Sequence, residues 1–420
     1  MKRDRIFLTK RFDRFNNPSS VDEYENLDGY KALKKAISMT REEILDEVDT
    51  ALLRGRGGAG FPAGIKMRSM LEEESDIKYI VCNADEGEPG TFKDGALLQK
   101  DPLSVIEGMT ISAYCCDAKY GYIYIRGEYG KIRAEFVEAV ENARKKGYLG
   151  ENILGVEGFD FDIKVVSGAG AYVCGENSAL LNSIEAKPGR PKVKMYHLAE
   201  KGLYDRPTLV NNVETFACLP IIVEEGGQRF LELGTKGGGG TKLISLSGHI
   251  KNPGVYEINL GTPMDEILNS EEFGGGSSTG HPIKFIHIGG QSGPLAFDEQ
   301  LKAEYSYDGL KEVGLSVGSG AIVVLDETVN VVEYLEHVFL FFEEESCGKC
   351  NPCRIGTTRI REILSDMVRG KGRKDDIETL EYLIDNVSSL AMCGLGQSED
   401  KAIISALKYR ENEFKELALN

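Results

Sequence analysis

Hydrophobic side chains recur along this chain with two different periods. In MTREEILDEVDTALL (39–53) the apolar positions share one helical face, and Thr40 with Glu43 forms a capping-box pattern before them, so we predict a helix at about 40–53. GKIRAEFVEAVENARKKG (130–147) predicts a second amphipathic helix, which stops at a glycine. Three apolar, β-rich runs alternate with the helical segments and predict a largely parallel α/β sheet. They are IKYIVCNA (77–84), YGYIYIRG (120–127) and FDIKVVSG (161–168).

The pattern changes after KGGGGT (236–241), a plausible domain boundary. LISLSGHI, GVYEI and KFIHIGG are short β-like runs separated by Gly- and Pro-containing turns, so a small mixed β domain is predicted. After IVVLDE (322–327) apolar residues return to helical spacing, which predicts a small helix bundle. We therefore expect three domains, at 1–240, 241–325 and 326–420.

Composition narrows the class of protein. A chain of 420 residues with 41% hydrophobic content is long enough for two or three cores. The net charge of −17 argues against nucleic-acid binding, which needs a surplus of Lys and Arg. The basic N-terminus MKRDRIFLTKRFDRF is followed by no apolar run of signal-peptide length, and no stretch is predicted to span a membrane. We expect a cytoplasmic protein without direct membrane insertion.

The stretch RGRGGAGF (54–61) contains Gly55, Gly57 and Gly60 in the G-x-G-x-x-G pattern of dinucleotide-binding βαβ units. That fingerprint needs a strand before the loop, whereas here a helix is predicted. Several glycines between two arginines still favour a cradle for a phosphate or a flavin, because bare N–H groups can approach an anion closely. The alternative is a Gly-rich connector, which is normally polar and does not end in Gly-Phe-Pro.

Nine cysteines, an odd number, do not indicate a disulfide framework. Cys347, Cys350 and Cys353 stand in C-x₂-C-x₂-C spacing, and Cys393 follows 40 positions after the third. Three close thiolates and a distant fourth are typical of a 4Fe-4S cluster, whereas four-cysteine zinc sites usually consist of two separated pairs. Four buried thiols without a metal are the remaining alternative. The others are expected to be small buried side chains: Cys82, Cys115, Cys116, Cys174 and Cys218.

A single cluster accepts one electron at a time, so a donor of electron pairs needs a flavin between itself and the cluster. The glycine loop and the cysteine set together thus favour a relay from a hydride donor to a one-electron carrier. Hydride transfer itself requires no general acid or base, and none of the five histidines stands in a convincing catalytic pattern.

Motifs along nearly the whole chain resemble one family. It is the NADH-binding flavoprotein (51 kDa-type) subunit of respiratory NADH:quinone oxidoreductase, a module that recurs in NAD-linked hydrogenases, formate dehydrogenases and electron-bifurcating complexes. The resemblance implies an α/β fold: a Rossmann-like FMN- and NAD(H)-binding domain, an SLBB-type β-grasp domain and a C-terminal four-helix domain with one 4Fe-4S cluster. The matching motifs are RGRGGAGFPAGIK (54–66), NADEGEPGTFKD (83–94), GAGAYVCGEN (168–177), VNNVET (210–215), ESCGKCNPCRIG (345–356) and MCGLG (392–396).

The resemblance also assigns roles to single residues. Phe61 and Glu88 are placed beside the nucleotide where hydride transfer occurs, with Phe61 offering an aromatic face. The glycine loop and a lysine are implied to bind the FMN phosphate and ribityl chain: Gly55, Arg56, Gly57, Gly58 and Lys66. Eight further residues are implied to complete the flavin pocket: Asn83, Asp85, Tyr172, Gly175, Glu176, Asn211, Asn212 and Thr215. Asn177 is implied to be a cofactor-binding position on the nucleotide side.

Three positions depart from the family pattern, and all lie on the nucleotide side. Asn177 replaces the second of two acidic residues, which would bond a ribose hydroxyl and repel a 2′-phosphate. Ser69 and His197 stand near places where the family has aromatic side chains. We therefore expect weakened or altered nucleotide binding, with NADP(H) as an alternative to NAD(H), and an intact flavin and cluster site.

The resemblance implies an NADH dehydrogenase (diaphorase-type) subunit in which hydride passes between NAD(H) and FMN and single electrons pass between FMN and the cluster. No ferredoxin-type cysteine set beyond this one occurs in the 420 residues, so we expect electrons to leave through partners: a 2Fe-2S thioredoxin-like subunit and a larger iron–sulfur subunit. One alternative is a subunit of an electron-bifurcating hydrogenase or formate dehydrogenase that uses ferredoxin. The other is an FMN and 4Fe-4S electron-transfer subunit with impaired nucleotide binding.

Overall fold

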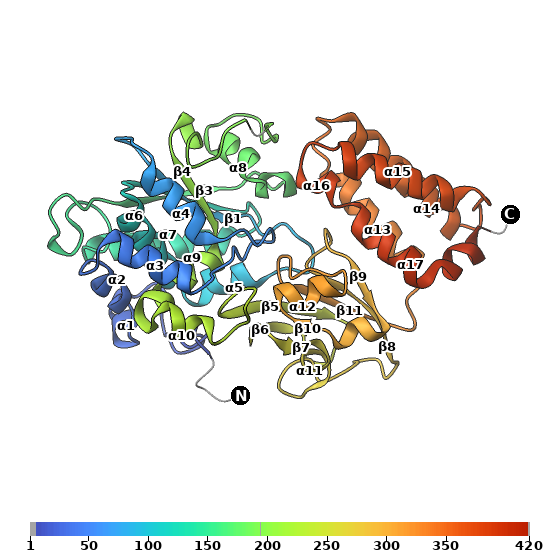
Figure 1. Cartoon of the computed structure of the whole chain (residues 1–420), viewed down its shortest axis with the longest axis horizontal. Coiled ribbons are helices and arrows are strands. Elements are labelled where there is room, and N and C mark those ends of the chain that lie inside the picture. Colours follow the sequence, from blue (N-terminus) through green and yellow to red (C-terminus); the bar gives the residue numbers. More distant parts are fainter. Residues whose placement is uncertain (1–5, 194, 419–420) are drawn as a thin grey trace.

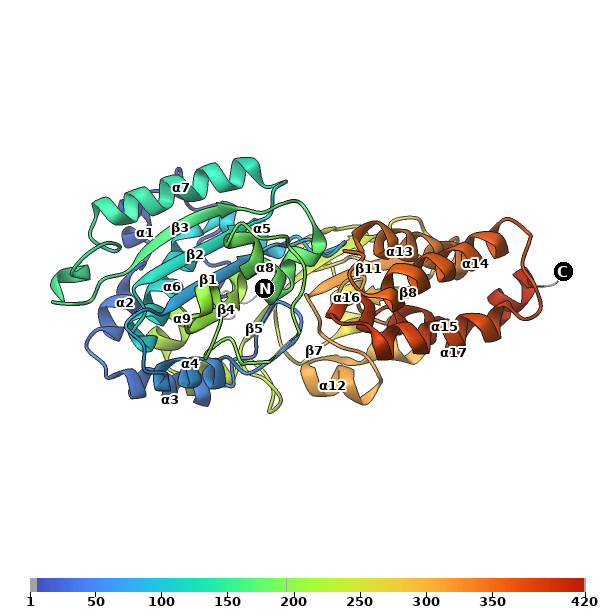
Figure 2. The ribbon, with the colours of Figure 1, turned by 90° about the horizontal axis from the view of Figure 1, so that it is seen from above.

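The first half of the chain folds around a parallel sheet. The structure, a computed structural model, describes residues 6–193 and 195–418. Its first sheet, on the left in Figure 1, has the strand order β3-β2-β1-β4 (Figure 2), and every neighbouring pair is parallel, as predicted. The strands are β1 (Tyr79–Ala84), β2 (Tyr120–Ile125), β3 (Asp162–Ser167) and β4 (Thr208–Asn212). The sequence pattern predicted the first three strands but not β4, which ends within the polar motif VNNVET.

Helices surround this sheet and share one hydrophobic core with it. The predicted helix at 40–53 is confirmed as α3, and both hydrogen bonds of the capping box between Thr40 and Glu43 are present, at 3.2 and 2.7 Å. Short 3₁₀ turns lie at Ile153–Gly155, Tyr172–Gly175 and Leu203–Asp205. The helices are α1 (Val21–Asn26), α2 (Lys31–Ala36), α3 (Arg41–Thr50), α4 (Ala63–Glu72), α5 (Lys93–Lys100), α6 (Pro102–Cys116), α7 (Gly130–Lys145), α8 (Asn177–Ile184), α9 (Val213–Glu225) and α10 (Gly227–Leu231).

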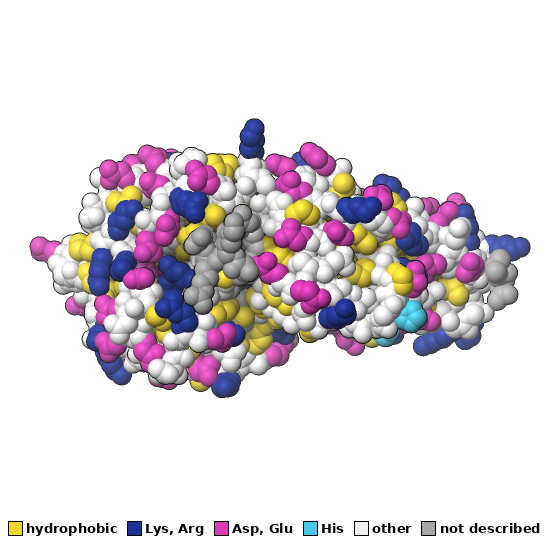
Figure 3. Space-filling view, turned by 90° about the horizontal axis from the view of Figure 1, so that it is seen from below, with side chains coloured by type: hydrophobic (Ala, Val, Ile, Leu, Met, Phe, Trp, Pro, Cys, Tyr) yellow, Lys and Arg dark blue, Asp and Glu magenta, His cyan; other side chains and the backbone are white. Residues whose placement is uncertain are grey.

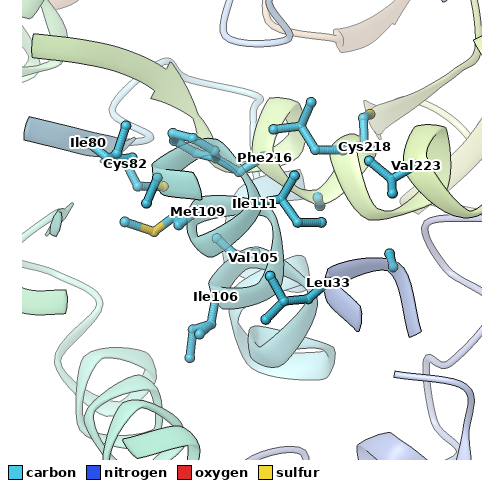
Figure 4. Close-up of a cluster of buried hydrophobic side chains, with 14 of the residues drawn as sticks. Leu33, Ile80, Cys82, Val105, Ile106, Met109, Ile111, Phe216, Cys218 and Val223 are labelled. Atoms are coloured by element: carbon cyan, nitrogen blue, oxygen red, sulfur yellow. The ribbon is translucent and has the colours of Figure 1, made fainter. Parts of the chain in front are cut away.

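Helix α6 is buried along almost its whole length, against α9 and the sheet (Figure 4). It is mostly apolar and is buried on all sides, Glu107 included, which leaves no amphipathic period to predict it from sequence. A Cβ atom on Gly108 would lie 1.9 Å from the carbonyl oxygen of Phe216, so only glycine permits this approach of α6 to α9. The five dispersed cysteines are buried, as predicted.

The second sheet is mixed, as the β-like runs predicted. Its order is β6-β5-β11-β8-β9. The strands that come first and last along the chain, β5 and β11, are neighbours and run parallel, and all other pairs are antiparallel, which is a β-grasp arrangement. A small pair, β7 and β10, lies beside it. The elements are β5 (Thr241–Gly248), β6 (Gly254–Asn259), β7 (Thr262–Pro263), α11 (Met264–Asn269), β8 (Ile283–Ile288), β9 (Leu295–Phe297), a 3₁₀ turn (Asp298–Lys302), β10 (Glu304–Tyr305), α12 (Tyr307–Glu312) and β11 (Ala321–Asp326).

Helices form the far end of the molecule, beyond the β-grasp unit (Figures 1 and 2). Apolar side chains of α13, α14, α15 and α17 share one core, which continues into β8 and β9 through Phe285, Leu295 and Phe297. The predicted helix bundle is thereby confirmed. Its elements are α13 (Val331–Glu345), a π-helical turn (Pro352–Thr357), α14 (Thr358–Val368), α15 (Asp376–Leu390), α16 (Gly394–Gln397) and α17 (Asp400–Leu417).

The surface carries charge of both signs. Acidic and basic side chains are interspersed over the face seen in Figure 3, in agreement with an acidity that is scattered along the sequence. Of the helices in the described part of the chain, none combines the length and the apolar character needed to cross a membrane.

Candidate functional site

A cavity of about 240 Å³ lies where the three parts of the chain meet. Residues from the flavin motifs line it together with Ser319 of the β-grasp unit and Cys393 of the helical end. The predicted site residues in its lining are Gly57, Asn83, Asp85, Glu88, Tyr172, Gly175, Glu176, Asn212 and Cys393. Sequence reasoning assigned no role to the other lining residues, which are Glu86, Thr91, Lys93, Asp94, Val173, Ser319, Gly394 and Leu395.

The glycine loop is one wall of this cavity. It runs from α3 to α4, so a helix precedes it, as the sequence pattern predicted. Gly58 and Gly60 have φ values of +137° and +63°, which disfavour other residue types. Gly57 lies against β4: a Cβ atom there would stand 3.0 Å from the Cβ atom of Asn212. This wall therefore presents backbone rather than side chains.

Other residues of the loop face elsewhere. The Arg56 guanidinium is fully buried and donates to the carbonyl of Gly239 at 2.7 Å and to the hydroxyl of Tyr307 at 3.1 Å, while its N–H donates to Thr215 Oγ1 at 2.9 Å. Arg56 thus ties the loop to the β-grasp unit. Phe61 is 49% exposed, and neither it nor Gly55 is among the described residues that line the cavity.

Lys66 and Asn211 lie next to each other, and neither is among the described residues that line the cavity. The Lys66 ammonium donates to the carbonyl of Val210 at 3.0 Å and to Asn211 Oδ1 at 3.1 Å. Burial lowers the pKa of Lys66 to about 8. Asn211 Nδ2 is buried without a hydrogen-bond partner. Since buried polar groups normally have partners, this amide and the ammonium fit an anionic or hydrogen-bonding ligand.

Three residues at the end of β1 and in the 3₁₀ turn shape the opposite wall. Asn83 Nδ2 donates to the carbonyl of Gly175 at 2.8 Å, and Asn83 Oδ1 accepts from the N–H of Asp85 at 3.1 Å. Asp85 Oδ2 is buried without a partner, and burial raises the pKa of this carboxyl to about 7. The backbone of Gly57 and the unpartnered Asp85 oxygen in the cavity lining, with the unpartnered Asn211 amide next to the lining residue Asn212, are a donor and acceptor set that fits FMN.

Glu88 and Tyr172 connect the three parts of the chain at the cavity. Glu88 accepts from the Tyr172 hydroxyl and, at 2.7 Å, from the N–H of Ser292 in the β-grasp unit. The N–H of Tyr172 donates to Glu345 at 2.9 Å, and its ring packs edge-on against Phe341, 5.2 Å between centroids. Tyr172 therefore holds the cavity against α13, the helix that leads into the cluster motif.

The residues that depart from the family pattern lie outside the described cavity lining. Glu176 is the N-cap of α8, and its carboxylate accepts from the N–H groups of Ser178 and Ala179 at 2.9 and 3.0 Å. Asn177 is the first residue of that helix, Ser69 is in α4, and His197 is exposed in the loop before β4. Of the two acidic positions in the family pattern, only Glu176 is acidic here, and its carboxylate caps helix α8.

The four cysteines of the motif come from the loop after α13, the π-helical turn and the N-cap of α16. Cys353 is buried beside Ser346 Oγ at 3.2 Å. Burial raises the pKa of the Cys393 thiol above its ordinary value. Hydrogen bonds from the N–H groups of Leu395 and Gly396 to its sulfur act in the opposite direction and limit this rise. Neighbouring N–H donors of this kind stabilise a thiolate that ligates a cluster.

The cluster motif also contacts the flavin side. Cys347 packs against the apolar group that contains Val173 and Cys174, and Lys349 donates to the carbonyl of Pro191 at 2.5 Å. Among residues 6–193 and 195–418, no group of three or more His, Cys, Asp or Glu side chains converges on the position of a single metal ion. A cubane takes one thiolate on each of its irons, so its ligands need not converge on one point.

The depressed pKa of Lys66 predicts how flavin affinity depends on pH. Without an anion this ammonium loses its proton near pH 8, and a bound phosphate favours the protonated form. FMN affinity of the flavin-free protein should therefore be greatest below pH 8 and fall up to about tenfold per pH unit above it. Fluorescence titration between pH 6.5 and 10 measures this. Lys66→Arg should flatten the profile, and an unchanged slope in Lys66→Met would refute the assignment.

Comparison with protein families identifies the cofactors of this chain. The Nuo51 FMN-binding domain matches residues 48–221, and the NADH-ubiquinone oxidoreductase-F iron-sulfur binding region matches residues 333–417. The first match contains the glycine loop and β1 to β4, and the second contains the four cysteines. The chain is thus a flavin and iron–sulfur protein, and the predicted 4Fe-4S cluster, rather than zinc, is confirmed.

Curated relatives extend the likeness over nearly the whole chain. The HndC subunit of the NADP-reducing hydrogenase of Solidesulfovibrio fructosivorans is 43% identical over 96% of this chain and 81% of its own length. The F subunit of the NADH-quinone oxidoreductase of Aquifex aeolicus is 40% identical over 94% and 91%, and that of Escherichia coli is 38% identical over 97% and 92%. The chain belongs to the family of NADH-quinone oxidoreductase F subunits.

A solved structure supports the same fold. The crystal structure of an NAD⁺-reducing [NiFe]-hydrogenase in the H₂-reduced state contains a chain that matches with a TM-score of 0.82 and 32% identity. The match covers 91% of this chain and 63% of that chain, so this chain spans somewhat less than two thirds of the hydrogenase chain's length.

Proposed function

We propose that this chain takes electrons from a nicotinamide nucleotide onto FMN held in the cavity and passes them to a 4Fe-4S cluster at Cys347, Cys350, Cys353 and Cys393. The observation that carries the proposal is that one cavity is lined both by residues of the flavin motifs and by Cys393. Bound FMN accepts a hydride as an electron pair, and the cluster takes electrons singly. Electron transfer between two such groups needs only that they lie close and fixed.

Several described residues support that arrangement. We assign Gly57 and Lys66 to the phosphate end and Asn83 and Asp85 to the flavin, and Tyr172 holds this wall against α13. Glu88, held by Tyr172 and Ser292, is the side chain we assign to the nicotinamide end of the nucleotide. We assign Phe61 to the entrance, where its exposed ring can cover the bound nucleotide.

We further propose that NADPH is accepted alongside NADH. Asn177 carries no charge to repel a 2′-phosphate, and Glu176 is occupied as a helix cap. Lys192 lies beside them, because its N–H donates to Ser178 Oγ at 2.9 Å, and its side chain is exposed. A neutral amide and a nearby cation favour a 2′-phosphate over a bare ribose hydroxyl.

Asn177→Glu tests this preference. The added carboxylate should lower kcat/KM for NADPH at least about tenfold relative to that for NADH, because it repels the 2′-phosphate. Steady-state rates with an artificial electron acceptor, measured with both nucleotides, give the ratio. Lys192→Glu should shift it in the same direction, and Lys201→Glu is a matched control in a neighbouring exposed segment. An unchanged ratio in Asn177→Glu would count against the assignment.

The family places this chain in a multi-subunit oxidoreductase. We propose a 2Fe-2S thioredoxin-like subunit against the flavin unit and a larger iron–sulfur subunit next to the helical end. A second candidate function, favoured by the 43% identity to a subunit of an NADP-reducing hydrogenase, is a role in an electron-bifurcating hydrogenase or formate dehydrogenase. Activity that requires ferredoxin together with the nucleotide would favour this candidate.

Anaerobic titration of the flavin with each nucleotide tests the proposed function. We expect NADH and NADPH to bleach the flavin absorbance of the purified holoprotein. If neither nucleotide bleaches it, the protein is an electron-transfer subunit that has lost nucleotide binding, and our proposal is wrong.

A further inference from the structure

The cavity wall contains a buried ammonium group, that of Lys93, to which the proposed function assigns no role. Lys93, the first residue of α5, lines the cavity and is 1% exposed. Its Nζ lies 2.7 Å from Asp94 Oδ1, 2.9 Å from Glu214 Oε2 and 3.3 Å from Asn212 Oδ1. All three protons of the ammonium are thus engaged, and the position of the charge is fixed.

Glu214 connects this ammonium to a second one. Lys242 of β5 lies 2.5 Å from Glu214 Oε2, and the N–H of Leu243 donates to Oε1 at 2.8 Å. Burial opposes charge on Glu214, but Lys242, Lys93 and Arg56 outweigh it and lower the pKa of this carboxyl to about 2. Glu214 is therefore ionised and accepts hydrogen bonds from both lysines. Burial lowers the pKa of the Lys242 ammonium to about 7, so Lys242 is only partly charged at neutral pH.

Lys93 stays protonated. Burial lowers the pKa of its ammonium, but Asp94 and Glu214 outweigh burial and hold that pKa above its ordinary value. In contrast, burial raises the pKa of Asp85 and of Glu86 to about 7, so both are partly neutral at neutral pH. Of the described residues that line the cavity, Lys93 is the only basic one.

We propose that Lys93 sets the reduction potential of the flavin by holding a positive charge against the cavity. Hydride transfer adds two electrons and one proton, so reduced flavin carries one more negative charge than oxidised flavin. A fixed cation in a low-dielectric wall stabilises that added charge and raises the potential, whereas Asp94 acts in the opposite direction. The inference rests on the proposed function, because it places the flavin in this cavity.

Spectroelectrochemical titration of the bound flavin in the holoprotein tests the inference through variants of opposite sign. Lys93→Gln keeps donors for Asp94 and Glu214 but removes the charge. It should lower the ratio of reduced to oxidised flavin at a fixed ambient potential at least tenfold, a shift of about 30 mV for two electrons. Lys93→Arg should retain the wild-type potential, and Asp94→Asn should raise it. Lys242→Gln, a matched lysine outside the cavity lining, should shift it less.

An unchanged potential in Lys93→Gln, or a lowered potential in Asp94→Asn, would overturn the proposal. If Lys93→Gln fails to fold, a raised potential in Asp94→Asn supports the proposal and a lowered or unchanged potential refutes it.

Flavin content distinguishes a wrong role for Lys93 from a wrong proposed function. Gly57→Val that retains its flavin would show that the flavin lies elsewhere, whereas loss of flavin in Gly57→Val with an unmoved potential in Lys93→Gln would refute the role of Lys93 only.

Discussion

Gly57→Val should abolish FMN binding while leaving the fold intact. A Cβ atom at this position would stand 3.0 Å from Asn212 Cβ, and valine adds two methyl groups in the wall where backbone must meet the ligand. The φ of Gly57 lies outside the left-handed region, so the substitution acts through space and not through backbone strain. Flavin content, read from absorbance after denaturation, should fall by at least about tenfold, more than about 1.4 kcal/mol in binding.

Gly130→Ala is the matched control. This glycine begins α7, and a Cβ atom there would meet nothing within 4 Å. We expect it to retain its flavin fully. Circular dichroism and thermal unfolding should show the wild-type fold in both variants. A folded Gly57→Val protein with stoichiometric flavin would contradict the position of the flavin site.

Cys393→Ser should lose the cluster and keep the flavin. Cys393 lines the cavity and is the cysteine that we propose as the distant fourth ligand, and a serine hydroxyl is a poor replacement for a thiolate that binds iron. Iron content should fall to near zero, and the electron paramagnetic resonance (EPR) signal of the reduced cluster should disappear. The nucleotide should still bleach the flavin, because the flavin residues of the other wall are unchanged.

Cys116→Ala is the corresponding control. Its sulfur is fully buried at the end of α6, far along the chain from the motif. This variant should keep wild-type iron content and an unchanged EPR signal. Full iron content in Cys393→Ser would exclude Cys393 as a ligand.

Sequence spacing predicted the elements whose signals are local. The capping box at Thr40, the strand runs of the parallel sheet and the helical faces of the C-terminal end each lie within one segment, and the structure contains them. Helix α6 lacked such a signal because it is buried on every side and has no polar face. Strand β4 was not predicted because it is short and ends in two asparagines, a residue type that is depleted in strands.

The site could be predicted only in part, because its residues come together from distant segments. The motif at 83–94 contains Lys93 and Asp94, yet nothing in its spacing shows that Glu214 and Lys242 meet them. Two serines of the β-grasp unit, at positions 292 and 319, reach Glu88 and the cavity only through the fold. Arg56 illustrates the converse, because its place in the glycine loop suggested a ligand contact, but its guanidinium bonds the β-grasp side of the molecule.

Rapid freeze-quench EPR on the purified chain, mixed anaerobically with NADH or NADPH, tests the central claim most directly. We predict that flavin bleaching is followed by the reduced-cluster signal within the same polypeptide, with no partner subunit added, and that Cys393→Ser shows the bleaching alone. Complete bleaching of the wild-type flavin without any cluster signal would contradict the proposed electron path.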